Sequence, residues 1–201
     1  MSKVEMMTKK DIRDLSVIGG GLEILDWILY DTLTIATGGT QTAFRFFQQA
    51  VGQAGISLEK TNMEIPGQLP AGYKFVCQKI CAVPRQALGL TIASLKDAVA
   101  VCQRGHVQFF IGTRPYIQMP LQNLLGGLLQ GFAATAVGAG TLEVAYAQPR
   151  TVLNGEMEYS PVVPANYAFN LALDYDVAPT LTASVDLQIQ LVGKLVRPRQ
   201  G

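Results

Sequence analysis

The most constraining feature of the sequence is a run of alternating apolar and polar residues near its C-terminus. The apolar members are Val185, Leu187, Ile189 and Leu191, and the polar members between them are Ser184, Asp186, Gln188 and Gln190. Successive side chains leave opposite faces of a pleated strand, so this period of two indicates one buried and one solvated face. The run therefore predicts a strand inside a sheet.

A second alternating run precedes it, and Ala178-Pro179 breaks the chain between the two. Its apolar members are Phe169, Leu171 and Leu173. We expect the terminal strand to complete a sandwich and to pair with residues 167–173. Pro198 is expected to end the ladder because proline lacks an N–H donor. Deletion of residues 194–201 is accordingly expected to leave the fold largely intact and to weaken assembly.

The N-terminal part is interpreted as an arm with a short helix, residues 1–30, ahead of a β-sandwich domain, residues 31–201. After three glycines, apolar residues fall at helical spacing at Leu22, Ile24, Leu25, Ile28 and Leu29. Read with a period of two, Leu33 and Ile35 instead begin a strand. Apolar runs on both sides of Gly38-Gly39 predict a β-hairpin.

The middle of the chain adds further short strands. The predicted strands are 73–83, 106–112, 114–121 and 141–149, and glycine- and proline-rich residues 48–72 form a loop. An approximate capping box at Ser94 and Asp97 predicts a short helix at 94–103, although residues 90–94 also fit a strand. Short strands with long, unequal loops predict an all-β antiparallel sandwich, with a single jelly roll preferred over a closed barrel.

Composition suggests that other subunits cover much of the surface. The 201 residues fit one domain, and only 15% are charged, against roughly 25% in soluble domains. Charged residues are depleted where subunits meet, so a homo-oligomer is the favoured interpretation, ahead of a monomer whose weakly charged surface is exposed. A net charge of +1 supplies no field to gather nucleic acid, so no specific nucleic-acid partner is expected.

Cys77, Cys81 and Cys102 form neither a disulfide framework nor a metal signature. On one strand, Cys77 and Cys81 would share a face about 13 Å apart, which is too far to bridge. Buried free thiols are expected, and they favour assembly in a reducing cytoplasm. No secretory leader is recognised at the start of the sequence.

The most apolar segment spans residues 124–140. Its length approaches the ~20 residues of a bilayer span, but it holds five glycines and lacks anchoring residues at its ends. A buried or inter-subunit loop is preferred, while a membrane-contacting loop and a true span stay open. The candidate subunit-interface residues are Leu124, Leu125, Leu128, Leu129 and Phe132, together with Arg197 and Arg199 of the terminal tail.

No catalytic or metal-binding constellation is visible in the sequence. His106 is the only histidine and begins a predicted strand, which excludes multi-histidine metal sites. Asp174 and Asp176 lack a calcium-loop pattern, and Glu156-Met157-Glu158 lies beside a turn. The sequence therefore predicts a protein that is not an enzyme and that holds no cofactor or metal.

Several segments resemble a type of bacteriophage virion structural protein. The matching segments are DTLTIATGGT (31–40), FRFFQ (44–48), TNMEIPGQLPAGYKF (61–75), FFIGTRPYIQMPL (109–121), VVPANYAFNLAL (162–173) and LVGKLVRPRQ (191–200). The resemblance implies a capsid-associated β-sandwich of viral jelly-roll type that assembles with copies of itself or with other coat proteins. It implies a virion location, with assembly in the host cytoplasm, and transfers no catalytic residues.

A second function class stays open from the residues alone. A β-sandwich of this kind also fits a carbohydrate- or ligand-binding module with a groove of exposed aromatic side chains. Trp27, Tyr116 and Tyr146 are the aromatic residues that such a groove would use.

Overall fold

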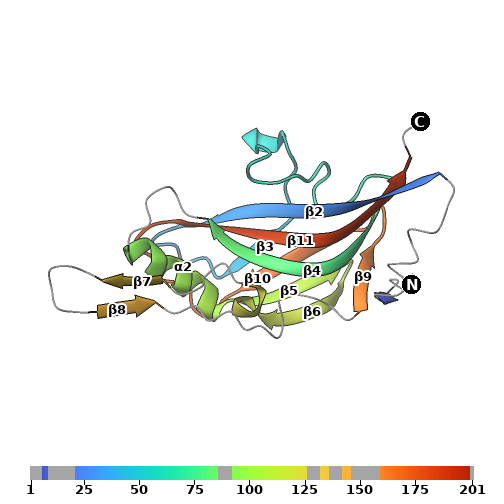
Figure 1. Cartoon of the computed structure of the whole chain (residues 1–201). Coiled ribbons are helices and arrows are strands. Elements are labelled where there is room, and N and C mark those ends of the chain that lie inside the picture. The colour runs from blue at the N-terminus through green and yellow to red at the C-terminus, as the bar shows by residue number, and fades with distance from the viewer. Residues whose placement is uncertain are drawn as a thin grey trace.

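The computed structural model places two antiparallel sheets face to face, with one helix at an end (Figure 1). It describes residues 6–8, 21–85, 92–125, 132–135, 142–145 and 159–199. The strands are β1 (Met6–Thr8), β2 (Leu22–Ile35), β3 (Ala43–Phe46), β4 (Lys74–Arg85), β5 (His106–Ile111), β6 (Arg114–Pro120), β7 (Phe132–Thr135), β8 (Leu142–Ala145), β9 (Tyr159–Val163), β10 (Phe169–Asp174) and β11 (Val185–Pro198). The helical elements are η2 (Gln53–Gly55), α2 (Ile92–Arg104) and η3 (Leu121–Leu124).

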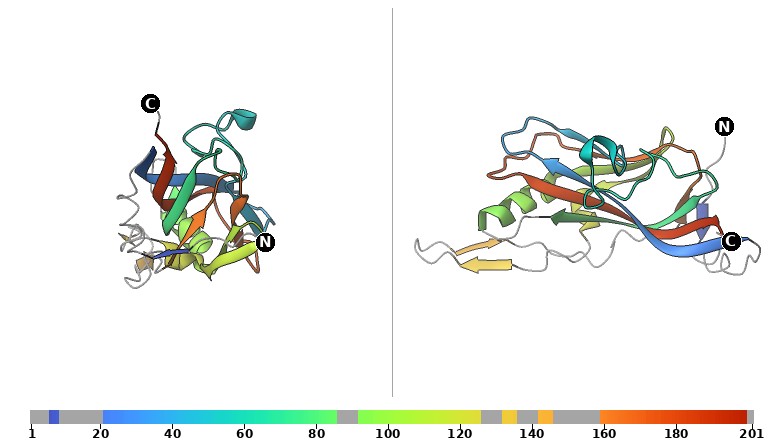
Figure 2. Two further views of the ribbon diagram at one scale, coloured as in Figure 1. Left: turned by 90° about the vertical axis from the view of Figure 1, so that its right-hand side faces the viewer. Right: turned by 90° about the horizontal axis from the view of Figure 1, so that it is seen from above.

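The first sheet has the strand order β1-β9-β4-β11-β2, and the second has the order β3-β10-β5-β6. Strands β7 and β8 form a separate hairpin, and the long strands β2 and β11 run side by side along the molecule (Figure 2). The prediction of an all-β antiparallel sandwich with a short helix is therefore confirmed.

The terminal run forms β11, a central strand of the first sheet. It lies between β2 and β4, and it ends at Pro198 as predicted. The expected pairing with residues 167–173 is wrong, because β10 belongs to the opposite sheet and pairs with β3 and β5. Both runs bury one face in the same core, so their alternation indicates burial without saying which layer each strand joins.

The helix expected within residues 1–30 is wrong over its apolar part. Residues 22–30 belong to β2, which continues unbroken to Ile35 and pairs with β11 at every position from Leu22 to Ile35. Helical spacing arose because apolar residues occupy both faces of this strand. Leu25 and Leu29 lie on the core side, whereas Ile28 is exposed on the outer side.

The hairpin expected around Gly38-Gly39 is also wrong. β2 pairs with β11 and β3 pairs with β10, so the connection between them crosses from one sheet to the other. Thr37 fixes this crossing, since its Oγ1 donates to the Leu181 carbonyl over 2.9 Å and its N–H donates to Ser184 Oγ over 3.2 Å.

The helix and the β5–β6 hairpin agree with the sequence. α2 extends to Arg104 and is followed by Gly105, and β5 and β6 meet at Gly112-Thr113, where Gly112 takes a φ of 63°. The Tyr175 hydroxyl donates to the Val101 carbonyl over 3.0 Å and ties the end of α2 to the segment after β10. The strand predicted at 141–149 appears as β8.

A bulge in β4 changes which side chains face the core. Val192 lies opposite Lys79 and Gly193 opposite Cys77, so Gln78 is an extra residue in β4. The shift places Cys77 in the core and Cys81 on the outer face of the sheet. The expectation that the two cysteines share a face is wrong for this reason, since a bulge breaks the period of two.

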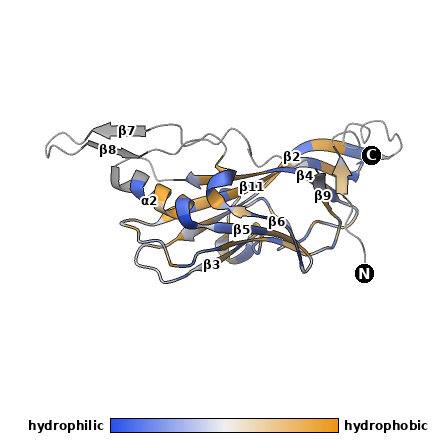
Figure 3. Cartoon of the chain, turned by 90° about the horizontal axis from the view of Figure 1, so that it is seen from below, coloured by the Kyte–Doolittle hydropathy of each residue, from blue (hydrophilic) through white to orange (hydrophobic). Residues whose placement is uncertain are grey.

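The core between the sheets is rich in phenylalanine. Phe46, Phe47, Phe75 and Phe109 have no exposed surface, and Phe169 has 1%. Phe47 and Phe169 pack with their ring centroids 5.6 Å apart. Orange and blue residues alternate along the strands in Figure 3, as expected for strands with one buried face.

Candidate functional site

The structure describes two of the candidate interface residues in the apolar segment, Leu124 and Leu125. Leu124 ends η3 with only 1% of its surface exposed, and half-buried Leu125 packs against the same core. Leu124 therefore serves the packing of its own chain. Leu128, Leu129 and the side chain of Phe132 lie outside the described residues, so an interface role there stays a prediction.

Arg197 lies at the far end of β11 in an ion pair with the neighbouring strand. Its Nε donates to Glu23 Oε2 over 2.8 Å, and its side chain is 26% exposed. The bond to Glu23, assisted by Tyr73, raises the pKa of Arg197. Arg199 follows as an exposed residue, and its N–H donates to the Gly21 carbonyl over 2.8 Å. Both arginines therefore hold the ends of β2 and β11 together.

A cavity of about 80 Å³ opens beside Arg197 on the core side of these strands. Its lining includes Trp27, Tyr73, Glu64, Gln68 and Arg197. Trp27 is 39% exposed, so an aromatic face and several polar groups border one opening. The space suits one side chain or a small part of a ligand. A second cavity, of about 190 Å³, lies at the opposite end of β2, around Ile35 and Gly39.

Trp27 stands opposite Gly193 in the β2–β11 register, at the point where β4 approaches β11 most closely. A Cβ placed on Gly193 would lie 1.9 Å from the Val76 carbonyl oxygen. No side chain other than hydrogen fits this position, because the bulge at Gln78 brings the two backbones together.

The loop between β3 and β4 covers the middle of the β2 edge. The Asn62 side chain imitates a strand backbone there: its Oδ1 accepts from the Tyr30 N–H over 2.9 Å, and its Nδ2 donates to the Ile28 carbonyl over 2.7 Å. Thr61 Oγ1 also donates to the Tyr30 carbonyl over 3.0 Å. Backbone groups of β2 that point away from β11 are thus satisfied at these residues.

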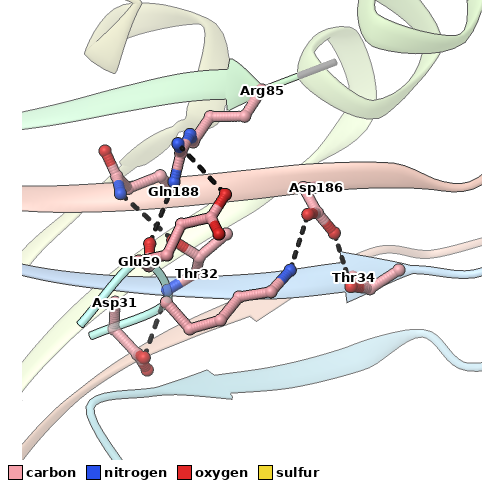
Figure 4. Close-up of polar contacts among 8 residues, drawn as sticks. Asp31, Thr32, Thr34, Glu59, Arg85, Asp186 and Gln188 are labelled. Atoms are coloured by element: carbon pink, nitrogen blue, oxygen red, sulfur yellow. Dashed lines mark hydrogen bonds and ion pairs between the residues drawn. The ribbon is translucent and has the colours of Figure 1, made fainter. Parts of the chain in front are cut away.

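The same loop reaches the outer face of the sheet, where a polar network joins it to three strands (Figure 4). Asp186 accepts from Lys60 over 2.6 Å and from Thr34 over 2.5 Å, and Arg85 donates to the Glu59 carbonyl over 2.9 Å. Burial disfavours ionisation of Asp186, but its bonds to Lys60 and Thr34 outweigh burial and lower its pKa. This network attaches the loop to the sheet.

Asp31 is a buried carboxylate that holds the end of β3. Its Oδ2 accepts from the Phe47 N–H over 2.5 Å, and its Oδ1 accepts from the Thr32 N–H over 3.1 Å. Phe47 takes a φ of 66°, a left-handed conformation that a bulky residue adopts only under external constraint. Burial raises the pKa of Asp31 despite these bonds. The carboxylate thus has a structural partner for each oxygen.

Asp97 performs a similar task on α2. Its carboxylate accepts from the Thr182 N–H and the Ala183 N–H, each over 2.9 Å, and from Thr182 Oγ1 over 2.6 Å. Burial opposes ionisation, but the three donors outweigh it and lower the pKa of Asp97. Asp97 had been assigned to a helix cap, and the structure instead shows it tying α2 to the segment before β11.

The three cysteines are free thiols, as predicted, with Cys77 and Cys102 buried and Cys81 half-buried. Burial raises the pKa of Cys102 to about 12 and raises that of Cys77 further, so both stay protonated thiols at neutral pH. His106 begins β5 as expected and is exposed. Within the described part of the chain, no group of three or more potential metal ligands gathers, and no helix has the length and apolarity of a membrane span.

Of the aromatic residues proposed for a ligand groove, the two that the structure describes belong to different sheets. Trp27 lines the cavity on the first sheet, Tyr116 lies on β6 in the second sheet, and Tyr146 lies outside the described residues. Sequence reasoning missed Asn62 and Tyr73 as residues of this site. Asn62 lies in a loop without a periodic pattern, and Tyr73 was predicted as the first residue of a strand, after the loop residues Pro70 and Gly72, with no sign that it borders a cavity.

Comparisons with protein-family models, with curated proteins and with solved structures found no match for the chain.

Proposed function

We propose that the protein is a structural protein of a virus particle, a capsid or minor coat protein of a bacteriophage, which assembles through interfaces with copies of itself and other coat proteins. The finer proposal for its fold is a single jelly roll. One observation carries both, namely the order in which the strands pair.

The strands pair in a nested order, in which strands from the two ends of the chain pair first with each other and the middle strands pair last. Apart from β1 and the β7–β8 hairpin, eight strands remain, and the first pairs with the last, β2 with β11. The second pairs with the seventh, β3 with β10, the third with the sixth, β4 with β9, and the two middle strands, β5 and β6, pair together. Every one of these pairs is antiparallel.

Such nested pairing, wrapped into two sheets of four strands, is the arrangement of a jelly roll, a fold found in viral capsid and lectin domains. The order β2-β11-β4-β9 in one sheet and β3-β10-β5-β6 in the other supports this assignment. Proteins that share this fold can have different functions, so the fold alone does not choose between a coat protein and a lectin-like domain. The low share of charged residues and the segment resemblance favour the coat protein.

Assembly of the purified protein tests the proposal. We expect light scattering and negative-stain electron microscopy to show particles or large regular oligomers at protein concentrations of tens of micromolar or above. The protein should also be found by mass spectrometry in purified virions of its source. A protein that stays monomeric at high concentration and is missing from such virions contradicts the proposal.

A ligand-binding module is the second candidate, favoured by the cavity beside Trp27. An exposed indole bordered by Glu64, Gln68 and Arg197 combines a stacking surface with hydrogen-bonding groups. A glycan array tests this function. Binding that is lost in Trp27→Ala and kept in Tyr116→Ala would support the module, and an array without signal would contradict it.

A further inference from the structure

The edges of the two sheets differ in how far they are closed to another strand. β1 and β3 are short, with three and four residues. β6 contains Pro115 and Pro120, which donate no backbone hydrogen bond, and carries a bulge at Tyr116. β2, the remaining edge, has fourteen residues and no proline. Among the described strands it is the edge with the least protection.

The loop covers β2 near its middle. Asn62 and Thr61 occupy the outward backbone groups of Tyr30 and the carbonyl of Ile28. Because outward groups alternate along a strand, those of Leu22, Ile24 and Asp26 point along the same edge. Among the described residues, none donates to or accepts from them. Within the described part of the chain, the segment Leu22–Ile28 is therefore open except at the Ile28 carbonyl, and we call it the open edge.

The open edge also carries exposed apolar side chains. Leu22, Trp27 and Ile28 expose 48%, 39% and 45% of their surfaces. Leu22 and Ile28 lie on the outer face of the sheet, near the end where β2 begins and β11 ends (Figure 1). A long, apolar edge with free backbone groups is a site where another strand pairs. Two acidic residues lie in it, and each is paired with a cation of β11: Glu23 with Arg197 over 2.8 Å and Asp26 with Lys194 over 2.5 Å.

We propose that this open edge pairs with the same edge of a second copy, β2 against β2 in antiparallel orientation across a two-fold axis. The choice of a second copy as the occupant rests on the proposed self-assembly and on the self-complementarity of the edge. Pairing of this kind joins the first sheets of two molecules into one continuous sheet.

Charge and shape select one register. Centring the axis on Asp26 places two carboxylates opposite each other and drives Leu22 toward Tyr30, where Asn62 occupies the edge. Centring it on Ile24 leaves Ile28 without a partner. Centring it on Leu25 places Leu22 opposite the partner's Ile28, twice by symmetry, and Ile24 opposite the partner's Asp26. The Leu25-centred register is therefore the proposed one.

The same register gives Arg197 and Trp27 a shared task. Trp27 of one copy lies opposite Glu23 of the other, and Glu23 holds Arg197 beside it. A guanidinium next to an indole face is a favourable contact, so Arg197 meets the neighbouring subunit through an aromatic ring.

Backbone substitutions test the edge itself. Ile24→Pro removes an outward N–H that β11 does not use, so the fold should persist while the contact weakens at least tenfold in analytical ultracentrifugation. Wild type should sediment with at least twice the 21.7 kDa mass of the chain. Ile24→Ala, which keeps the N–H, is the matched control and should weaken the contact less. A wild type that is monomeric at several hundred micromolar, or an Ile24→Pro variant that pairs as tightly as wild type, overturns the proposal.

Cross-linking tests the register. Opposite residues at the axis of an antiparallel pair lie close enough for a disulfide when their backbones are not hydrogen-bonded to each other, as Leu25 would be. In a Cys81→Ser background, Leu25→Cys should form a covalent dimer under mild oxidation. The more exposed Ile28→Cys is the control and should not, because the proposed register places the two copies of residue 28 far apart. Cross-linking at 28 in preference to 25 contradicts the register.

These outcomes are separable from those of the proposed function. A dimer that forms through β2 without any larger particle would contradict the virion role and leave the edge pairing standing. Particles that survive Ile24→Pro unchanged would support the virion role and overturn the edge pairing.

Discussion

Three single residues have structural roles that other side chains cannot replace without loss of stability. Gly193 allows β4 and β11 to approach, Asp31 holds Phe47 in a left-handed conformation, and Asp97 accepts three hydrogen bonds that anchor α2. None of the three lies in an exposed site. Their roles are structural, and the first and last give quantitative predictions.

Gly193→Ala should destabilise the protein strongly. The added methyl would meet the Val76 carbonyl oxygen at 1.9 Å, and relieving that overlap requires the backbone to shift. We expect a loss on the order of 3 kcal/mol in the free energy of unfolding, from urea denaturation. Gly39→Ala, whose Cβ would come no closer than 3.2 Å to a neighbour, is the control and should change stability by less than about 1 kcal/mol. Equal effects of the two variants would contradict the close approach.

Asp97 should make stability depend on pH. Its folded pKa lies below the ordinary value of 3.8, so its contribution is present above that value and is lost as pH falls through the folded pKa. Asp97→Asn should cost about 1–3 kcal/mol at pH 7, with a gap to wild type that narrows below pH ~4. The titration of Asp31 is common to both proteins and largely cancels.

Urea denaturation from pH 7 to pH 3 measures that gap. Thr182→Val keeps the carboxylate and its two backbone donors, so it should cost less than Asp97→Asn at pH 7. A gap between wild type and Asp97→Asn that stays constant over this range would show that the carboxylate is not the titrating group.

At the scale of elements, sequence patterns identified the strands better than their partners. β10, β11 and the β5–β6 hairpin were predictable because each buries one face and ends at a proline, glycine or turn. The first half of β2 was mistaken for helix because Ile24 and Ile28 place apolar side chains on its outer face as well. Both residues belong to the open edge, so the residues that misled the pattern are among those proposed to contact another copy.

The pairing partners of the strands and the candidate site were harder to predict from the sequence. Sheet membership depends on contacts between residues far apart in sequence, as in the pairing of Leu22 with Pro198. The bulge at Gln78 leaves no pattern of its own, and Trp27 acquires its setting from a loop that contributes Tyr73. Of the predicted contact residues, Arg197 lines the cavity and Leu124 fills the core.

The tail of the chain gives a prediction that the structure reverses. Residues 194–198 belong to β11 and pair on one side with β2 along their whole length, and on the other side with β4 through Val196. Deleting 194–201 should therefore unfold the protein or lower its melting temperature by well over 10 °C, contrary to the expectation from sequence. Deleting 199–201 removes only residues beyond β11 and should shift the melting temperature by no more than a few degrees. Thermal scanning of both truncations checks this, and a stable 194–201 deletion would contradict the central position of β11.

At the scale of the whole molecule, part of the exposed apolar surface lies along one edge of the first sheet, at Leu22, Trp27 and Ile28. The interior takes the phenylalanines, and the loop between β3 and β4 covers the middle of that edge. The proposed assembly would use backbone pairing at this edge, which depends little on side-chain identity and can combine with other contacts in a shell.

The nested pairing also governs the order in which the molecule is completed. β11 lies between β2 and β4, yet it is the last of the three to leave the ribosome. Until residues 185–198 emerge, β2 and β4 each lack their central neighbour, and two long strands wait with unpaired backbone groups. Closing the sheet joins β11 to residues between 101 (Asp186 with Arg85) and 176 (Pro198 with Leu22) positions away in the chain, which makes folding slow and leaves nascent chains prone to pairing with one another. The strand at the centre of the first sheet is therefore also the one whose late synthesis leaves β2 and β4 exposed in the nascent chain.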